Sequence, residues 1–288
     1  GLWEVPQESA VEAALATPVA AGSDCRTRTR SQATPSLFCW SVMMTHGYEP
    51  DLLNLQLSSD ASIFACNDYE VFTGEAATLT SAASQCTLPT TVVDVRAAAR
   101  GDMSIPSYTT NSWLNVENFL AAWASILKSG RYLNRDYTVK TDPDAVFFPQ
   151  RLRPLLPSAP GPTYLLNCNK FYRAMYGSVE VISREAVQVF GERGPDCKAS
   201  FVNQTHWGED WYLQRCFFWL GLKGTARFGM VSDFNGHCTD DVPDSCLDGD
   251  QVAFHPFKSV DRYGECLGQA AQRDAAVPQP AAVSQQLP

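Results

Sequence analysis

The sequence predicts an α/β protein, because apolar runs typical of buried strands alternate along the chain with segments of helical periodicity. Three runs, at 36–44, 61–67 and 90–95, are almost continuously apolar, as expected of strands buried on both faces of a sheet. Between the first two, the segment 49–59 places leucines at helical spacing. The length of 288 residues allows one large α/β domain or two small ones, and an apolar content of 45% supplies an ample core.

The clearest helix is expected over 111–130, "NSWLNVENFLAAWASILKSG". Its apolar residues recur at steps of three and four, which is the period of one helix face. Asn111 or Ser112 can cap its start, Lys128 suits its last turn, and Gly130 suits its end.

The two ends of the chain are expected to be flexible. Residues 1–36 and 268–288 are rich in small and polar residues and Pro, with a short helix at 7–16 as the one periodic segment. Such segments lack the apolar side chains that would offset the entropy lost on ordering. We therefore expect a flexible N-terminal arm over 1–36, an ordered domain over 37–267 and a flexible C-terminal tail over 268–288.

Composition excludes several classes of function. The net charge of −9 argues against a nucleic-acid partner, since phosphate binding relies on clustered Lys and Arg. The one basic cluster, Arg26, Arg28 and Arg30, is expected to be a solvated or processed segment. No run reaches the roughly 18 apolar residues of a membrane-spanning helix. The chain starts at Gly1, so we expect any membrane attachment to be made through a signal or anchor absent from this chain.

The ten cysteines indicate disulfides and an oxidising compartment. None forms a C-x-x-C pair, so zinc-ribbon and thioredoxin-like sites lack their spacing. Proximity suggests that Cys238 and Cys246 close a short loop and that Cys39 and Cys66 join neighbouring strands. Asn203-Gln204-Thr205 is an acceptor sequence for N-glycosylation, which suits a glycoprotein of the secretory pathway.

Two acids follow the strand expected at 137–140. In open α/β sheets, ligands collect at the carboxyl ends of strands, where Asp142 and Asp144 lie here on either side of Pro143. Two nearby carboxylates repel each other unless one takes a proton or a cation joins them, and Mn²⁺ or Mg²⁺ accepts such oxygen ligands. The alternative is an Asp-Pro turn with solvated side chains. Lys140 could contact a phosphate or pair with an acid.

Three later segments carry further candidates. The segment 175–190 runs from a glycine-containing loop into a strand and a Ser-capped helix. Glu209 and Asp210 occupy the first turn of a helix expected at 209–222, where acids also complement the helix dipole. His255 follows an apolar strand and is either a structural residue or a ligand.

In this order, the elements "VKTDPDAVFFP", "MYGSVEVIS", "GEDWYLQRC" and "HPFK" resemble the GT-A class of nucleotide-sugar glycosyltransferases, closest to the β1,3-glycosyltransferase and Fringe-like branch. The resemblance covers roughly residues 37–260. It implies a GT-A, Rossmann-like three-layer sandwich with a mixed, mostly parallel central sheet, here stabilised by disulfides. It also implies a Golgi or ER lumenal, or secreted, hexosyltransferase that inverts the anomeric centre and moves a sugar from a nucleotide-sugar donor to a glycan or glycoprotein acceptor.

The resemblance assigns roles residue by residue. It makes Asp142, Asp144 and His255 the ligands of Mn²⁺ or Mg²⁺, which bridges the donor diphosphate. It makes Asp210 the general base on the acceptor hydroxyl, with Glu209 beside it. The other implied contacts are with the donor, at Trp40, Ser41, Val42 and Lys140, and with the acceptor side of the sugar site, at Tyr176, Gly177 and Trp207.

The sequence also departs from that pattern, and two rival interpretations remain. Many relatives have a third acid in the metal motif, whereas Thr141 and Ala145 flank it here, and the segment 238–246 has no counterpart in the pattern. A catalytically inactive scaffold or carbohydrate-binding subunit with the same fold is the first rival. A hydrolase using Asp142 and Asp210 is the second, but it leaves Asp144 unexplained.

Overall fold

The computed structural model describes residues 23–27, 31–102, 110, 112–169, 174–201, 204–232, 238 and 242–276. The helix expected at 7–16, Arg28 and Arg30 of the basic cluster, Asn111 and the glycosylation residue Asn203 lie outside these residues.

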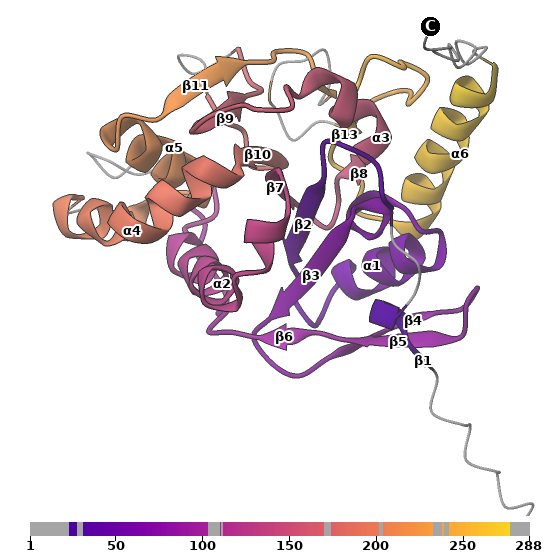
Figure 1. Cartoon of the computed structure of the whole chain (residues 1–288). Coiled ribbons are helices and arrows are strands. Elements are labelled where there is room, and N and C mark those ends of the chain that lie inside the picture. Colours follow the sequence, from indigo (N-terminus) through magenta and orange to yellow (C-terminus); the bar gives the residue numbers. More distant parts are fainter. Residues whose placement is uncertain are drawn as a thin grey trace, which may run out of the picture.

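A seven-stranded mixed sheet forms the centre of the molecule (Figure 1). Its strands, in spatial order, are β11 (Lys223–Ala226), β9 (Thr163–Leu166), β10 (Val179–Ser183), β7 (Tyr137–Thr141), β2 (Leu37–Val42), β3 (Asp68–Thr73) and β6 (Thr91–Val92). Strand β10 is antiparallel to both of its neighbours, and the other pairs are parallel. The predicted α/β class with a mixed, mostly parallel sheet is confirmed.

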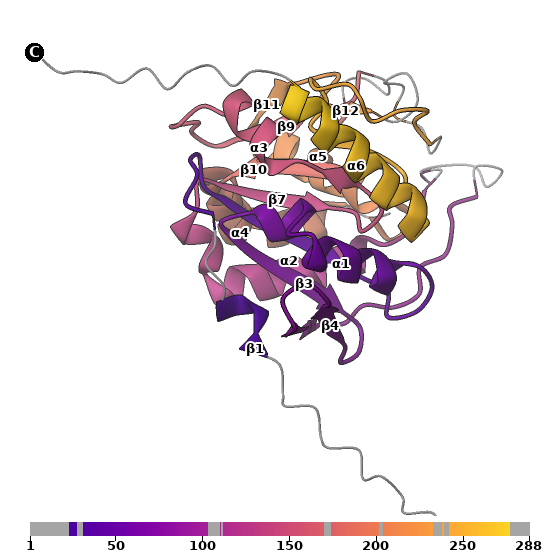
Figure 2. The ribbon, with the colours of Figure 1, turned by 90° about the vertical axis from the view of Figure 1, so that its right-hand side faces the viewer.

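Helices cover both faces of this sheet, which gives three layers (Figures 1 and 2). One face packs against α2 (Val116–Ser129), α4 (Arg184–Ser200) and α5 (Glu209–Trp219) through an apolar cluster that contains Trp40, Phe72 and Ile182. The opposite face carries α1 (Glu49–Ser58) and α6 (Val260–Ala276). None of the described helices combines the length and apolarity that crossing a bilayer requires.

Two small sheets and short helical turns complete the described fold. One sheet has the order β1 (Ser23–Asp24), β5 (Cys86–Pro89), β4 (Thr78–Ser81), and the other has the order β12 (Val231–Ser232), β13 (Ala253–Phe254), β8 (Val146–Phe147). The short helices are α3 (Pro149–Leu152) and the 3-10 turns η1 (Cys25–Thr27), η2 (Ser62–Ala65), η3 (Arg131–Asn134), η4 (Arg153–Leu155) and η5 (Gln204–His206). The second sheet positions the candidate site described below.

Three expected elements differ from the structure. The apolar run 61–67 is mostly the 3-10 turn η2, because a short apolar run does not distinguish a buried turn from a strand. The helix expected from 111 begins at Val116 after Asn115, and Trp113 instead pairs with Arg100 in a β-bridge. Only two residues of the run 90–95 form a strand, whereas Gly130 does end α2 in the left-handed conformation.

Five disulfides join the ten cysteines. The expected pair Cys39–Cys66 is confirmed. The expected pair Cys238–Cys246 is wrong, because Cys238 pairs with Cys168 and Cys246 pairs with Cys266. Both partners are brought close by the tertiary fold rather than by the sequence. The remaining bridges are Cys25–Cys86 and Cys197–Cys216.

The ordered chain extends beyond both expected domain boundaries. At the N-terminal side, β1 pairs with β5 and Cys25 is buried in its disulfide. At the C-terminal side, α6 continues to Ala276, where Asp274 forms an ion pair of 2.8 Å with Arg151. The boundary expected at 267 therefore lies within a helix whose apolar face is buried against the domain.

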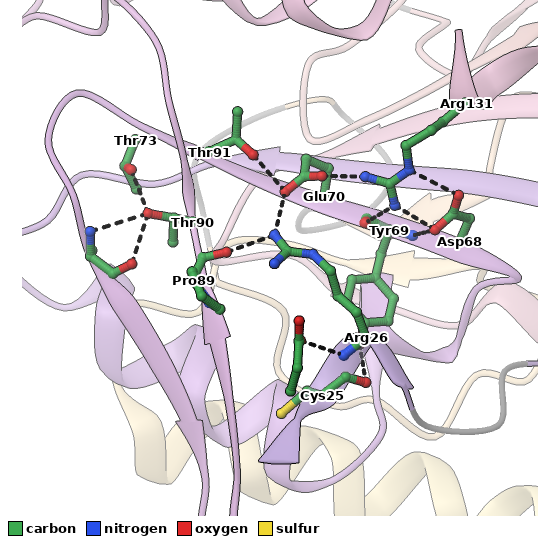
Figure 3. A network of polar contacts seen from close by, with 12 residues as sticks. Cys25, Arg26, Asp68, Tyr69, Glu70, Thr73, Pro89, Thr90, Thr91 and Arg131 are labelled. Carbon is green, nitrogen blue, oxygen red and sulfur yellow. Dashed lines mark hydrogen bonds and ion pairs between the residues drawn. The ribbon is translucent and has the colours of Figure 1, made fainter. Parts of the chain in front are cut away.

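A network of ion pairs ties the N-terminal segment to strand β3 (Figure 3). Arg131 binds Asp68 at 2.5 Å and also contacts Glu70, and both acids are nearly buried. Arg26 contacts Glu70 at 3.1 Å and donates to the carbonyl oxygen of Pro89 at 2.7 Å. Two guanidinium groups thus neutralise two adjacent acids at the amino end of β3.

Candidate functional site

Asp142, Asp144 and His255 form a cluster of potential metal ligands where β7 ends. One ligand atom from each side chain lies within 4.8 Å of the other two. Nε2 of His255 is 3.4 Å from Oδ1 of Asp144, and both side chains are buried, whereas the Asp142 side chain is 31% exposed. Two carboxylates and an imidazole suit a divalent cation such as Mn²⁺. The donor set therefore fits the metal that the sequence predicted.

Local turn geometry and the small sheet together create this cluster. The amide of Ala145 donates to the carbonyl oxygen of Asp142 at 3.1 Å, which closes a turn after β7. Strand β8 then pairs with β13 in antiparallel register, Val146 opposite Phe254, so His255 follows β13 at the level of Ala145, next to Asp144. The expected Asp-Pro turn exists, but it buries Asp144 rather than leaving it solvated.

The surroundings of Asp144 contain further ionisable groups. Burial opposes ionisation of Asp144, but the hydrogen bond and charge of His255, with Lys258 nearby, hold its pKa below the ordinary value. The hydroxyl of Tyr48 donates to Oδ2 of Asp144 at 3.5 Å. Burial, with the charge of Asp144 and against the hydrogen bond from the Met44 amide, raises the pKa of Glu49 to about 7. These two residues at the start of α1 place further acidic groups beside the potential metal ligands.

Lys140 links the metal cluster to helix α5. Its ammonium is buried, forms an ion pair with Oδ1 of Asp142 at 2.7 Å, and donates to the carbonyl oxygen of Gly177 at 2.6 Å and to Oε1 of Glu209 at 2.6 Å. The ring of Phe119 lies 4.6 Å from Nζ. Burial alone would lower the pKa of Lys140, but Asp142 and Glu209 hold it well above the ordinary value. The lysine is therefore charged and fully engaged.

Helix α5 presents its two acids to the same place. Oδ2 of Asp210 accepts from the amide of Gly177 at 3.1 Å, and Oδ1 accepts from the amide of Trp211 at 2.7 Å. A Cβ atom at position 177 would lie 2.8 Å from Oε1 of Glu209, so only glycine allows this close approach. Burial, with the charge of Glu209, raises the pKa of Asp210 to about 7. That pKa suits a group that exchanges protons near neutral pH.

Glu180 is a buried acid in the same region. Strand register places Trp40, Lys140 and Glu180 side by side across β2, β7 and β10. Neither carboxylate oxygen of Glu180 has a hydrogen-bond partner among the described residues. Burial raises its pKa well above the ordinary value, and Glu209 and Asp210 raise it further against the effect of Lys140. Burial thus favours the neutral form of Glu180.

The loop before β10 completes the arrangement. The ring of Tyr176 lies edge-on to His255, with ring centroids 5.8 Å apart. Asn167 fixes this loop, because its side chain accepts from the amide of Tyr176 at 2.6 Å and donates to the carbonyl oxygens of Tyr176 and Val179. All four sequence segments expected to form a site thus meet in the structure.

The structure corrects the expected donor contacts. Trp40 is fully buried and packs between Phe72 and Trp123, so its ring has no surface for a nucleotide. Ser41 is also buried and donates to a backbone carbonyl of β7, and Val42 is only 9% exposed. These strand residues belong to the core because β2 is covered on both faces.

Two further expected site residues contact protein groups. The ammonium of Lys140 is buried and lies within 2.7 Å of three protein oxygens, so it is not exposed to a donor phosphate in this structure. Trp207 is half-buried and packs against Phe201, with ring centroids 5.6 Å apart, beside the apolar cluster of α2, α4 and α5. Its contact with an acceptor stays a prediction.

Sequence reasoning missed several residues of the site. Glu180 carries a usable signal, since an acid inside the apolar strand "VEVIS" must be buried or paired. Tyr48, Glu49 and Asn167 carry none, because only the fold brings them to the metal cluster and the Tyr176 loop.

Comparison with known proteins gives little direct help. No protein-family model matches the chain, and no curated protein matches it. A similar solved structure is described as "crystal structure of a glycosyltransferase involved in the glycosylation of the major capsid of PBCV-1". It is 12% identical, covers 84% of this chain and 100% of its own, and superimposes with a TM-score of 0.39. So loose a superposition carries no argument, and the proposals below rest on side-chain geometry.

Proposed function

We propose that this chain is a metal-dependent glycosyltransferase that moves a sugar from a nucleotide-sugar donor to a hydroxyl group of a glycan or glycoprotein. The observation that carries the proposal is the meeting of a potential metal cluster, Asp142, Asp144 and His255, with the acids of α5 through Lys140 and Gly177. Paired acids at a metal cluster serve reactions in which one anion leaves while a hydroxyl loses its proton.

In the proposed reaction, Asp142, Asp144 and His255 hold Mn²⁺ or Mg²⁺, which when bound supplies Lewis-acid stabilisation of the leaving diphosphate. Asp210 accepts the proton of the acceptor hydroxyl, for which a pKa of about 7 is well suited. Its carboxylate is oriented by the amides of Gly177 and Trp211 at the rigid start of α5.

Glu209 fixes the position of Asp210 relative to the metal cluster, because its Oε1 is tied to Lys140. Attack from the side of the sugar opposite the diphosphate inverts the anomeric centre. The five disulfides support an oxidising location, such as the lumen of the secretory pathway or the cell exterior.

Binding and turnover can be tested separately. Calorimetry with a panel of nucleoside diphosphates and Mn²⁺ should show metal-dependent binding to the wild type, and Asp144→Asn should abolish it. Asp210→Asn should keep this binding and lose sugar transfer and donor hydrolysis. Asp94→Asn, which changes an exposed acid, is the control and should retain both. Equal nucleotide affinity in wild type and Asp144→Asn would exclude the metal site.

An inactive scaffold with the same fold is the second candidate. It is favoured by one observation: both oxygens of Asp210 accept from backbone amides, as in a purely structural helix cap. A scaffold would bind glycan or nucleotide without transfer or hydrolysis of any donor in the panel.

A further inference from the structure

Lys140 contacts the metal cluster, the Gly177 loop and helix α5 at once. The three segments are far apart in sequence, and each provides one oxygen within 2.7 Å of the same ammonium. The ammonium donates to Gly177 and Glu209 and forms an ion pair with Asp142. Because it is buried among these protein oxygens, it is placed to fix the groups around it.

The contact with Asp142 bears directly on metal binding. Lys140 holds Oδ1 of Asp142, and this carboxylate is the most exposed of the three potential ligands. A partly exposed side chain loses rotamer freedom when it coordinates an ion, unless a second contact has already fixed it. Hydrogen-bond partners of metal-ligating carboxylates perform this task in known metal sites.

The groups that pack around the Lys140 ammonium hold it in one position. The ring of Phe119 lies 4.6 Å from Nζ, and Glu180 stands opposite Lys140 across the strand pair. The carbonyl of Gly177 and the carboxylate of Glu209 then hold the ammonium from the side of α5.

We propose that Lys140 is a positioning residue of the metal centre, which orients Asp142 for a divalent cation and couples that ligand to the acids of α5. This proposal rests on the proposed function. A fixed ammonium also repels a dication, so the charge of Lys140 by itself weakens metal binding. Replacement of Lys140 therefore distinguishes the two effects: loss of the orientation of Asp142 weakens metal binding, whereas loss of the repulsion strengthens it.

The test measures the binding of Mn²⁺ without any nucleotide. The concentration of free Mn²⁺ is read from its electron paramagnetic resonance signal. Lys140→Met keeps the length of the side chain and removes the ammonium, and we expect binding about 10–100-fold weaker than in the wild type. Lys258→Met is the matched control, because it removes an exposed positive charge near Asp144. It should bind Mn²⁺ as tightly as the wild type or slightly more tightly.

Folding must be separated from metal binding. Lys140→Met leaves the carboxylate of Glu209 without the cation that it contacts and places Glu180 opposite an apolar side chain, so Lys140→Met/Glu180→Gln, which removes the ionisable group of Glu180, provides a second variant. Circular dichroism and thermal unfolding without metal identify the folded variants. A merely structural lysine would lower the melting temperature and leave the Mn²⁺ affinity of the folded protein unchanged.

The outcomes separate this proposal from the proposed function. Unchanged or tighter Mn²⁺ binding in a folded Lys140 variant overturns the positioning role and leaves the proposed function in place. Absence of Mn²⁺ binding in the wild type overturns the metal centre itself and both proposals with it. Weaker binding in the Lys140 variants, with Lys258→Met like the wild type, supports the positioning role.

Discussion

Replacement of the buried acid Glu180 by Gln tests the electrostatics of the site without any substrate. Glu180 is fully buried, its two oxygens have no hydrogen-bond partner among the described residues, and its pKa lies well above the ordinary value, first because of burial. We therefore expect Glu180 to keep its proton in the folded protein at a pH where the unfolded chain has lost it. Gln has nearly the same shape and no charge, so Glu180→Gln leaves the charge of the folded site unchanged.

The magnitude follows from proton linkage. In the unfolded chain Glu180 ionises around its ordinary pKa of 4.5, whereas in the folded protein it keeps its proton. Above that pH the folded state binds one more proton than the unfolded state, so stability falls as pH rises, by about 1.4 kcal/mol per unit. Glu180→Gln has no ionisable group at this position, so its stability does not fall with pH for this reason. Two pH units above the ordinary pKa, its stability should have gained about 2 kcal/mol on the wild type, relative to their difference at the ordinary pKa, where half of the unfolded chains are already ionised.

Urea unfolding of both proteins between about pH 4.5 and pH 7 measures this difference at each pH. Burial of the Gln amide adds a cost that is the same at every pH. The prediction therefore concerns only how the stability difference between the two proteins changes with pH. A stability difference that stays constant over the range would refute the reasoning. It would mean that Glu180 is ionised in the folded protein and paired with Lys140 across the strands.

Three further predictions concern the acid at α5, the loop beside it and the ion-pair network. The transfer rate should fall about tenfold per pH unit below about pH 7, because burial raises the pKa of Asp210 to about 7 and the protonated acid cannot accept a proton. Asp210→Asn should be slower by about 10²–10⁴-fold and lose this dependence, and a wild-type rate independent of pH would exclude Asp210 as the base. Gly177→Ala should reduce the rate of sugar transfer without changing the melting temperature. The added Cβ would lie 2.8 Å from Oε1 of Glu209 and displace this carboxylate. A rate equal to that of the wild type would show that the close approach of Gly177 and Glu209 is not required. Arg131→Met should lower the free energy of unfolding in urea by about 2 kcal/mol or more, since it leaves two nearly buried carboxylates of β3 close to each other. The control Arg96→Met, which removes an exposed arginine, should have no measurable effect. Equal stability of these two variants would show that the network of Figure 3 contributes nothing.

Local patterns predicted the elements that carry the site. The apolar run of β7 followed by Asp142 and Asp144, and the two acids opening α5, are signals contained within a few residues. The order of these segments along the chain then suggested that they meet. The structure brings them together, and the roles of the individual residues remain predictions.

The partners of the individual side chains could not be predicted, because they depend on the face of the sheet and on strand order. Trp40 lies near the carboxyl end of β2, where a donor-binding residue was expected, yet its ring points into the core beneath α2. Lys140 lies two residues before a potential metal ligand and shares that buried face through strand register. Cys168 and Cys238 meet only because the fold brings together segments 70 residues apart.

The acids clustered near the carboxyl end of β7 are better explained by a role in a reaction than by a role in stability. Asp142 and Glu209 share the buried ammonium of Lys140, whereas Asp144 contacts His255 and Asp210 accepts from backbone amides. Burial of four acids so close together costs stability. An apolar core of the same volume would be at least as stable. A structural need for Lys140 would be met by one acid, as an isolated buried ion pair requires. The excess negative charge is offset when a dication and a proton from a substrate hydroxyl reach the site, which is what the proposed reaction supplies.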